Sequence, residues 1–182
     1  MPLDEAATSL HSPFHEERLF ALCVLLDAYA RGDEKTKREI HRTYLDHREY
    51  VNNWDLVDGS APQLVGAHLE SRSRALLQKM SRSKRLWDRR IAVLATLHFI
   101  KQDDFDDTLA LAEALLDDPE DLMHKAVGWM LRETGKRDAA VLRGFLDRHQ
   151  TRMPRTMLRY AIERLPERER KRRLAARARE SV

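Results

Sequence analysis

Cysteine is nearly absent from this sequence, and it has no long apolar run and no glycine-rich loop. Its 182 residues include one cysteine, Cys23, and six glycines, which excludes a disulfide scaffold and a cysteine-rich metal site. No apolar run approaches the roughly 18 residues that span a bilayer, and residues 1–10 lack the basic-then-apolar build of a signal peptide. We therefore expect neither membrane insertion nor secretion. Cys23 stands among leucines, so we expect it to be buried.

The motifs of several enzyme classes are missing as well. The sequence contains no HExxH, no GxSxG and no paired carboxylates in apolar surroundings. His11 and His15 are four residues apart, but Pro13 between them favours a helix start over a metal site. His98 and His124 adjoin apolar stripes, which is typical of packing residues. We expect no metal ion and no cofactor.

Charge is plentiful and unevenly distributed. Charged residues make up 35% of the chain, against roughly 25% in globular proteins. Residues 1–150 carry a net charge of −4, whereas residues 151–182 carry +7. A basic segment of this kind either binds a polyanion such as nucleic acid or is a solvated tail, and the charge distribution leaves both interpretations open.

Apolar residues recur every three or four positions throughout the chain, which predicts an all-α protein. Five of the six prolines stand where a helix would begin, namely Pro13, Pro62, Pro119, Pro154 and Pro166. Gly32 and Gly135 follow amphipathic stretches and are expected to end helices in a left-handed conformation. The predicted helices cover residues 13–31, 34–47, 54–70, 72–81, 85–101, 105–117, 119–134, 138–149, 154–164 and 166–179.

A short pattern repeats along these helices. A basic residue precedes a small residue by three positions at Arg18 and Ala21, at Arg89 and Ala92, and at Lys125 and Gly128, with intervals of 71 and 36 residues. A period of about 35 is typical of solenoids built from helical hairpins, although coincidence among alanine-rich helices also produces it. We predict a single domain over residues 1–182, an α-α superhelix that ends in a basic helix or tail at 166–182.

Lysine and arginine residues are concentrated in the repeated helices, whereas residues 102–121 contain nine acidic residues and neither lysine nor arginine. The pattern predicts a basic concave groove and an acidic helix outside it. Counterion release from such a groove would supply affinity for nucleic acid without sequence preference. The groove residues are Lys84, Arg85, Arg89, Arg90, Lys125, Arg132, Lys136, Arg137, Arg155 and Arg159.

One aromatic and one acidic residue form the candidate reactive pair. Trp54 and Asp58 are one helical turn apart and share a face, whereas Asp55 is rotated away. A carboxylate stabilises the positive charge that develops on a sugar when an N-glycosidic bond breaks, and an indole face attracts the same cation. A core tryptophan beside a helix N-terminal aspartate has the same spacing, so spacing leaves both readings open. Trp87, with Leu86, Ile91 and Leu94 nearby, favours core packing.

Five segments resemble the DNA alkylation repair family of AlkD-like glycosylases. They are Ser-Pro-Phe-His-Glu-Glu-Arg-Leu (12–19), Asn-Asn-Trp-Asp-Leu-Val-Asp (52–58), Leu-Trp-Asp-Arg-Arg-Ile-Ala (86–92), His-Lys-Ala-Val-Gly-Trp-Met-Leu-Arg-Glu (124–133) and Met-Pro-Arg-Thr-Met-Leu-Arg-Tyr-Ala-Ile-Glu (153–163). The resemblance implies HEAT-like repeats around duplex DNA and hydrolytic release of cationic 3-methyladenine and 7-methylguanine without base flipping. Compared with the family pattern, the chain looks shortened before Ser12, and Asn53 stands where some relatives have a further aromatic residue.

Carried over onto this sequence, the resemblance assigns Asp58 as the catalytic aspartate and Trp54 and Trp129 as the cleft tryptophans. It assigns Arg90 to DNA contact and Arg132 to the backbone or the cleft. With the groove residues Arg89, Lys125, Arg155 and Arg159, these form the predicted site. We expect a monomeric DNA N-glycosylase of the cytoplasm, associated with the nucleoid when bound to DNA. The alternative is a non-catalytic DNA-binding or protein-scaffold module.

Overall fold

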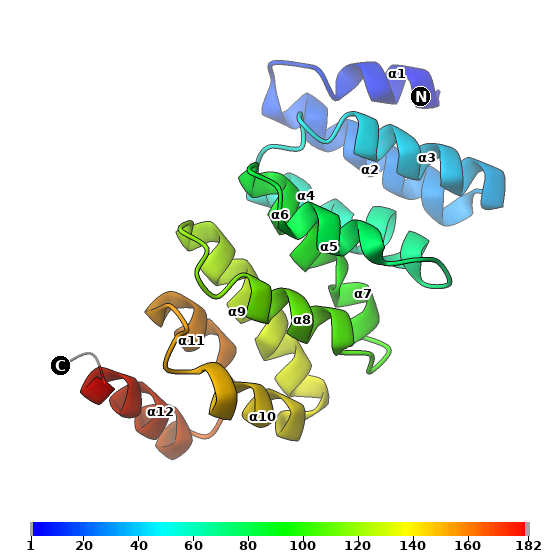
Figure 1. Cartoon of the computed structure of the whole chain (residues 1–182). Coiled ribbons are helices and arrows are strands. Elements are labelled where there is room, and N and C mark those ends of the chain that lie inside the picture. Colours follow the sequence, from blue (N-terminus) through cyan, green and yellow to red (C-terminus); the bar gives the residue numbers. More distant parts are fainter. Residues whose placement is uncertain (1, 181–182) are drawn as a thin grey trace. The chain divides into compact units, whose positions relative to one another are not determined.

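The computed structural model describes the backbone of residues 2–180 and the side chains of residues 2–175, and that part of the chain contains helices and no strands (Figure 1). The all-α, HEAT-like solenoid fold predicted from the sequence is confirmed. The helices are α1 (Leu3–Ser9), α2 (His15–Arg31), α3 (Glu34–Asp46), α4 (Trp54–Ala61), α5 (Ala75–Ser81), α6 (Leu86–Ala95), α7 (Leu97–Ile100), α8 (Asp106–Ala114), α9 (Asp121–Arg137), α10 (Ala139–His149), α11 (Arg155–Ala161) and α12 (Glu167–Glu180).

The chain divides into two compact units between His98 and Phe99. In a repeat protein each hairpin contacts only its neighbours, so this division is compatible with one domain. The single domain stays a prediction. In the first unit, α2 packs against α1, α3 and α4, and α4 packs against α6. In the second unit, α9 is the central helix and contacts α8, α10 and α11.

Both cores consist of apolar residues at helical spacing. In the first unit Leu22, Leu25 and Ile40 are almost fully buried, and in the second Phe145 and Met157 are. Burying a side chain of this size contributes about 1.5–3 kcal/mol. The apolar stripe of each helix therefore selects which face turns inward, which is why periodicity predicts most of these helices.

The predicted helix 54–70 is one helical run with a change of pitch. After α4 the chain continues as a π-helical turn, η1 (Pro62–Gly66), and a 3₁₀ turn, η2 (Ala67–Leu69). Pro62 has no N–H to donate to the preceding turn, which accounts for the local widening. The proline was expected to start a helix and instead lies inside one. A helix not predicted, α1, precedes residue 12.

The same capping arrangement recurs ahead of three helices. In each case the backbone carbonyl of a loop residue accepts a hydrogen bond from the side chain of the residue six positions later. The three bonds run from Arg18 Nη1 to Ser12 O at 2.8 Å, from Arg89 Nη1 to Ser83 O at 2.9 Å, and from His124 Nε2 to Asp118 O at 2.6 Å. The side-chain oxygen of the same loop residue also accepts a hydrogen bond from the backbone N–H of the residue two positions later. The intervals of 71 and 35 residues agree with the predicted repeat.

Small residues of the repeated pattern lie between helices. Ala21 and Ala92 are buried. A Cβ added at Gly128 would meet Met157 O and Tyr160 Cβ, both at 2.6 Å. Gly128 therefore lets α9 and α11 approach closely.

Three local predictions were wrong. No glycine has a positive φ. Gly135 lies inside α9, and its missing Cβ leaves room for Leu142. Cys23 is exposed, because the buried face of α2 runs through Ala21, Leu22 and Leu25 and turns residue 23 outward. Trp87, expected in the core, is half-buried.

The basic C-terminal segment forms α12 up to Glu180, and residues 181–182 of the prediction lie outside the described part. Ion pairs join α12 to α10: Arg143 Nη2 lies 3.0 Å from Glu169 Oε2, and Arg173 Nη1 lies 2.9 Å from Asp147 Oδ1. None of the helices among the described residues is long and apolar enough to cross a membrane.

Candidate active site

The N-terminus of α4 presents Trp54 to solvent. Asn53 is the N-cap, and its side-chain oxygen accepts the backbone N–H of Trp54 at 2.8 Å. The indole of Trp54 is 55% exposed, which is unusual for so large an apolar group. His15 Nε2, at the start of α2, lies 2.6 Å from Asp55 Oδ2 and ties the two helix N-termini together. Asp55 thus faces away from the reactive pair, as predicted.

Asp58 is held by a bidentate ion pair. Arg90 on α6 donates from Nε to Oδ1 at 2.8 Å and from Nη2 to Oδ2 at 2.7 Å. The Arg90 side chain is 5% exposed and that of Asp58 is 12% exposed. Because each carboxylate oxygen has a second lone pair, two acceptor sites remain on Asp58 after the fork is satisfied. The carboxylate is therefore oriented by Arg90 and keeps a narrow opening to solvent.

A buried tyrosine lies below α4. Ser60 Oγ lies 3.0 Å from Tyr44 Oη, on α3, and 2.6 Å from the carbonyl oxygen of Leu56, and its single hydroxyl proton is donated to one of these two acceptors at a time. Burial raises the pKa of Tyr44, and the negative charges of Asp58 and Asp88 raise it further against the opposing hydrogen bond from Ser60. Tyr44 is thus a neutral hydroxyl that packs the floor of the site.

Arg89 has a structural task in the first unit. Its Nη1 donates to the carbonyls of Ser83 and Lys84, and the residue is buried. Both Arg89 and Arg90 were predicted to contact DNA. That assignment stays a prediction. The structure shows that Arg89 binds backbone carbonyls and that Arg90 binds Asp58.

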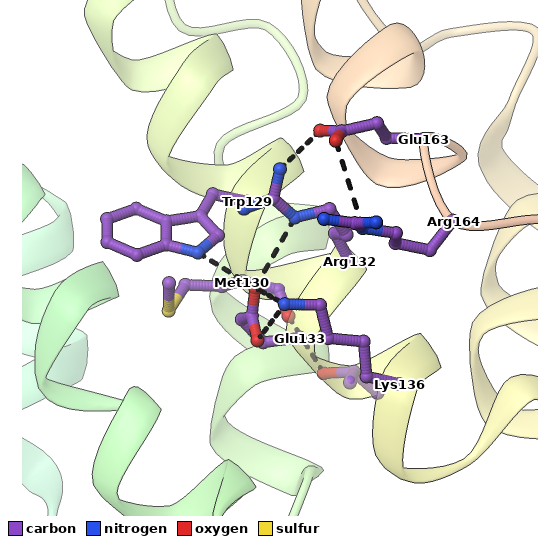
Figure 2. Close-up of polar contacts among 8 residues, drawn as sticks. Trp129, Met130, Arg132, Glu133, Lys136, Glu163 and Arg164 are labelled. Atoms are coloured by element: carbon purple, nitrogen blue, oxygen red, sulfur yellow. Dashed lines mark hydrogen bonds and ion pairs between the residues drawn. The ribbon is translucent and has the colours of Figure 1, made fainter.

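The second unit carries a separate cluster around Trp129 on α9 (Figure 2). The indole N–H of Trp129 donates to Glu133 Oε1 at 2.9 Å. Arg132 forms ion pairs with Glu133, at 3.3 Å, and with Glu163 in the turn after α11 (Arg155–Ala161). Lys136 Nζ binds both oxygens of Glu133 at 2.7 and 2.8 Å. Trp129 and Arg132 are therefore brought together, with Glu133 between them.

Two of the remaining predicted cations, Lys125 and Arg159, line a hollow in the second unit. It has a volume of about 430 Å³ and lies among α9, α11 and α12, lined in part by Lys125, Arg159, Tyr160 and Arg170. Lys125 Nζ lies 2.8 Å from Asp121 Oδ2. Arg159 is exposed, as is Arg155 on the same helix.

The described residues offer no candidate metal site. The described residues contain no group of three potential ligands drawn from His, Cys, Asp and Glu. His11 stacks on Tyr50 with ring centroids 4.0 Å apart, and His98 Nε2 lies 3.6 Å from Glu70 Oε2. His15 begins α2, in agreement with the predicted helix start. The contacts of His98 and His124 are compatible with the prediction that these two histidines are packing residues.

The decisive comparison is with families of known proteins. A model described as DNA alkylation repair enzyme matches residues 2–165. The chain belongs to the DNA alkylation repair enzyme family. The match begins ahead of Ser12 and includes α1, so it extends further than the segments that carry the resemblance in the sequence. A search of the curated proteins finds no match.

A solved structure supports the fold of this family member. The chain is similar to a predicted DNA alkylation repair enzyme from Enterococcus faecalis, with a TM-score of 0.69 and 15% sequence identity, over 92% of this chain and 78% of that one. An identity this low supports the shared helical architecture alone.

Sequence reasoning missed two features of this family member's site. Glu133 stands one turn after Trp129, the same spacing as Trp54 and Asp58, and that spacing was a usable signal. The contact between His15 and Asp55 joins residues 40 positions apart, and nothing local in the sequence announces it.

Proposed function

We propose that this chain is a DNA glycosylase that hydrolyses the N-glycosidic bond of cationic alkylated purines, of the 3-methyladenine and 7-methylguanine type, in duplex DNA. The observation that carries the proposal is the solvent-exposed Trp54 one helical turn from a carboxylate fixed by Arg90. Family membership supports DNA as the substrate and alkylation damage as the lesion.

The chemistry needs little from the protein. The bond between C1′ and the purine nitrogen breaks, its electron pair neutralises the positive charge of the base, and positive charge develops on the sugar. Water adds to C1′ and releases one proton. Asp58 stabilises the sugar cation and orients the water through its free lone pairs. No acid is needed to protonate the leaving base, because alkylation has already made it cationic.

In this mechanism Arg90 acts on Asp58. The two hydrogen bonds from the guanidinium fix the orientation of the Asp58 carboxylate. They prevent the carboxylate from rotating toward the exposed indole or toward solvent. Trp54 offers a π face to the cationic base, an attraction worth about 1–2 kcal/mol when desolvated. Within the second unit, Trp129 offers an aromatic surface to DNA, and Lys125, Arg132, Arg155 and Arg159 contribute phosphate contacts. Contact at the DNA surface would not require the base to leave the helix, and we propose that it stays stacked.

A non-catalytic DNA-binding or scaffold module is the second candidate. It is favoured by one observation: both oxygens of Asp58 are engaged by Arg90 and the carboxylate is mostly buried, as in a purely structural ion pair. The two candidates differ in whether the isolated chain releases a base.

The test is a single-turnover reaction on duplex DNA with one 7-methylguanine, with the free base quantified by chromatography. Asp58→Asn should lower release at least about 100-fold while DNA affinity is kept or raised. Asp106→Asn removes the same charge from an exposed position on α8 and should release base at the wild-type rate. Equal release by wild type and Asp58→Asn would remove Asp58 from the mechanism, and no release by wild type would support the binding module.

A further inference from the structure

Trp129 has a fixed orientation on α9. Its indole N–H points at Glu133 Oε1, 2.9 Å away and one turn along the same helix. Figure 2 shows the six-membered edge of the ring directed away from the ion-pair cluster. The terminal torsion of a tryptophan side chain is broad and allows several ring orientations. A hydrogen bond from the indole N–H selects one of them.

Glu133 is itself held from two other directions. Lys136 Nζ binds both carboxylate oxygens, and Arg132 Nε lies 3.3 Å from Oε1. The Glu133 side chain is 18% exposed. Burial raises the pKa of Glu133, but the hydrogen bonds from Lys136 and Trp129 and the nearby positive charges outweigh it, so the pKa lies below its usual range. Glu133 is therefore an ionised acceptor.

The cluster is anchored to the turn that follows α11. There Arg132 pairs with Glu163, and Arg164 Nε lies 3.9 Å from Glu163 Oε1. Gly128 brings α9 and α11 close together one turn before Arg132. The carboxylate that holds the indole is thus fixed by interactions along α9 and by the contact between α9 and α11.

The two tryptophans differ in this respect. Trp54 and Asp58 have the same spacing as Trp129 and Glu133, yet Asp58 is bound by an arginine from another helix. The single hydrogen-bond donor of the Trp129 indole, its N–H group, is engaged by the carboxylate of Glu133. The ring therefore meets a partner with its π face, which suits stacking on a base or contact with a cationic sugar or base.

We propose that Glu133 is a positioning residue that holds the indole of Trp129 in the orientation used to contact the alkylated nucleotide. The inference rests on the proposed function and adds a residue to it. Glu133 acts through Trp129 and Arg132 and does not touch the reacting atoms.

The first measurement follows the indole in the free protein. In a background with Trp54→Phe and Trp87→Phe, Trp129 is the only tryptophan, and its fluorescence anisotropy and quenching by acrylamide report its mobility and exposure. Glu133→Ala should raise the quenching constant at least about two-fold and lower the anisotropy. Glu133→Gln keeps an oxygen acceptor for the indole and should restore at least half of the difference. The matched control is Glu113→Gln on α8, an exposed glutamate, which should leave both values unchanged.

The second measurement uses the chain with all its tryptophans and the 7-methylguanine duplex. Glu133→Ala should lower the single-turnover rate at saturating protein about ten-fold, with a smaller change in the concentration needed for half saturation, and Glu133→Gln should recover most of the rate. Unchanged Trp129 fluorescence in Glu133→Ala, or a Gln variant as impaired as the Ala variant in both measurements, would overturn the inference. If wild type releases no base, the proposed function fails, while the free-protein fluorescence still decides whether Glu133 fixes the indole.

Discussion

Replacing Arg90 with methionine tests whether the ion pair with Asp58 orders the site. The two hydrogen bonds are short, at 2.8 and 2.7 Å, and both side chains are largely removed from water. Removing one member of such a pair leaves an uncompensated charge and costs about 3–5 kcal/mol. A chain of 182 residues changes its melting temperature by about 2–4 °C per kcal/mol. Arg90→Met should therefore melt about 6–20 °C below wild type.

The assay is urea and thermal unfolding followed by circular dichroism at neutral pH. Arg155→Met makes the same substitution at an exposed position and should change the free energy of unfolding by no more than about 0.5 kcal/mol. A double-mutant cycle with Asp58→Asn isolates the pair, and the coupling should exceed about 1.5 kcal/mol. A loss below about 1 kcal/mol in Arg90→Met, or additive effects in the cycle, would refute the argument that the fork holds Asp58.

Two further predictions concern packing and pH. Gly128→Ala places a methyl group 2.6 Å from Met157 O and should destabilise the chain by about 1–3 kcal/mol, whereas Gly144→Ala on α10, where the nearest atom is 3.8 Å away, should stabilise it by up to about 1 kcal/mol. Chemical denaturation of both variants checks this pair. His68 stacks on His41 with ring centroids 3.9 Å apart, and burial, with the charges of His41 and Arg72, lowers the pKa of His68 from 6.5 to about 4. The unfolded chain then binds more protons than the folded one between these values, so stability should fall as pH drops from 6.5 toward 4, and His68→Asn should flatten that dependence in unfolding measured across the range.

Most of the helices were predictable from the sequence because their causes are local. Apolar periodicity defines α2, α3, α9 and α10 to within a few residues. The change of pitch at Pro62 was missed because the proline was interpreted as a helix start, although its missing N–H accounts for the π-helical turn. The exposure of Cys23 depends on one rotation of α2, which its neighbours in sequence do not decide.

The candidate site was predictable in part. The spacing of Trp54 and Asp58 defines a shared face in any helix, and the solvent exposure of Trp54 agrees with a surface role. Arg90 was recognised as important, but its partner lies 32 residues away on another helix. Glu133 could have been found from the same one-turn spacing applied to Trp129.

The amino-acid sequence alone therefore determined the helical class, the repeat period and the residues that share a helix face, since hydrogen bonds and side-chain contacts within one or two turns govern these properties. Tertiary structure alone decided that Asp58 meets Arg90, that His15 meets Asp55 and that Arg132 on α9 meets Glu163 in the turn after α11. Those contacts join residues more than 30 positions apart, and they exist only because apolar burial brings separate helices together and leaves particular charges facing one another.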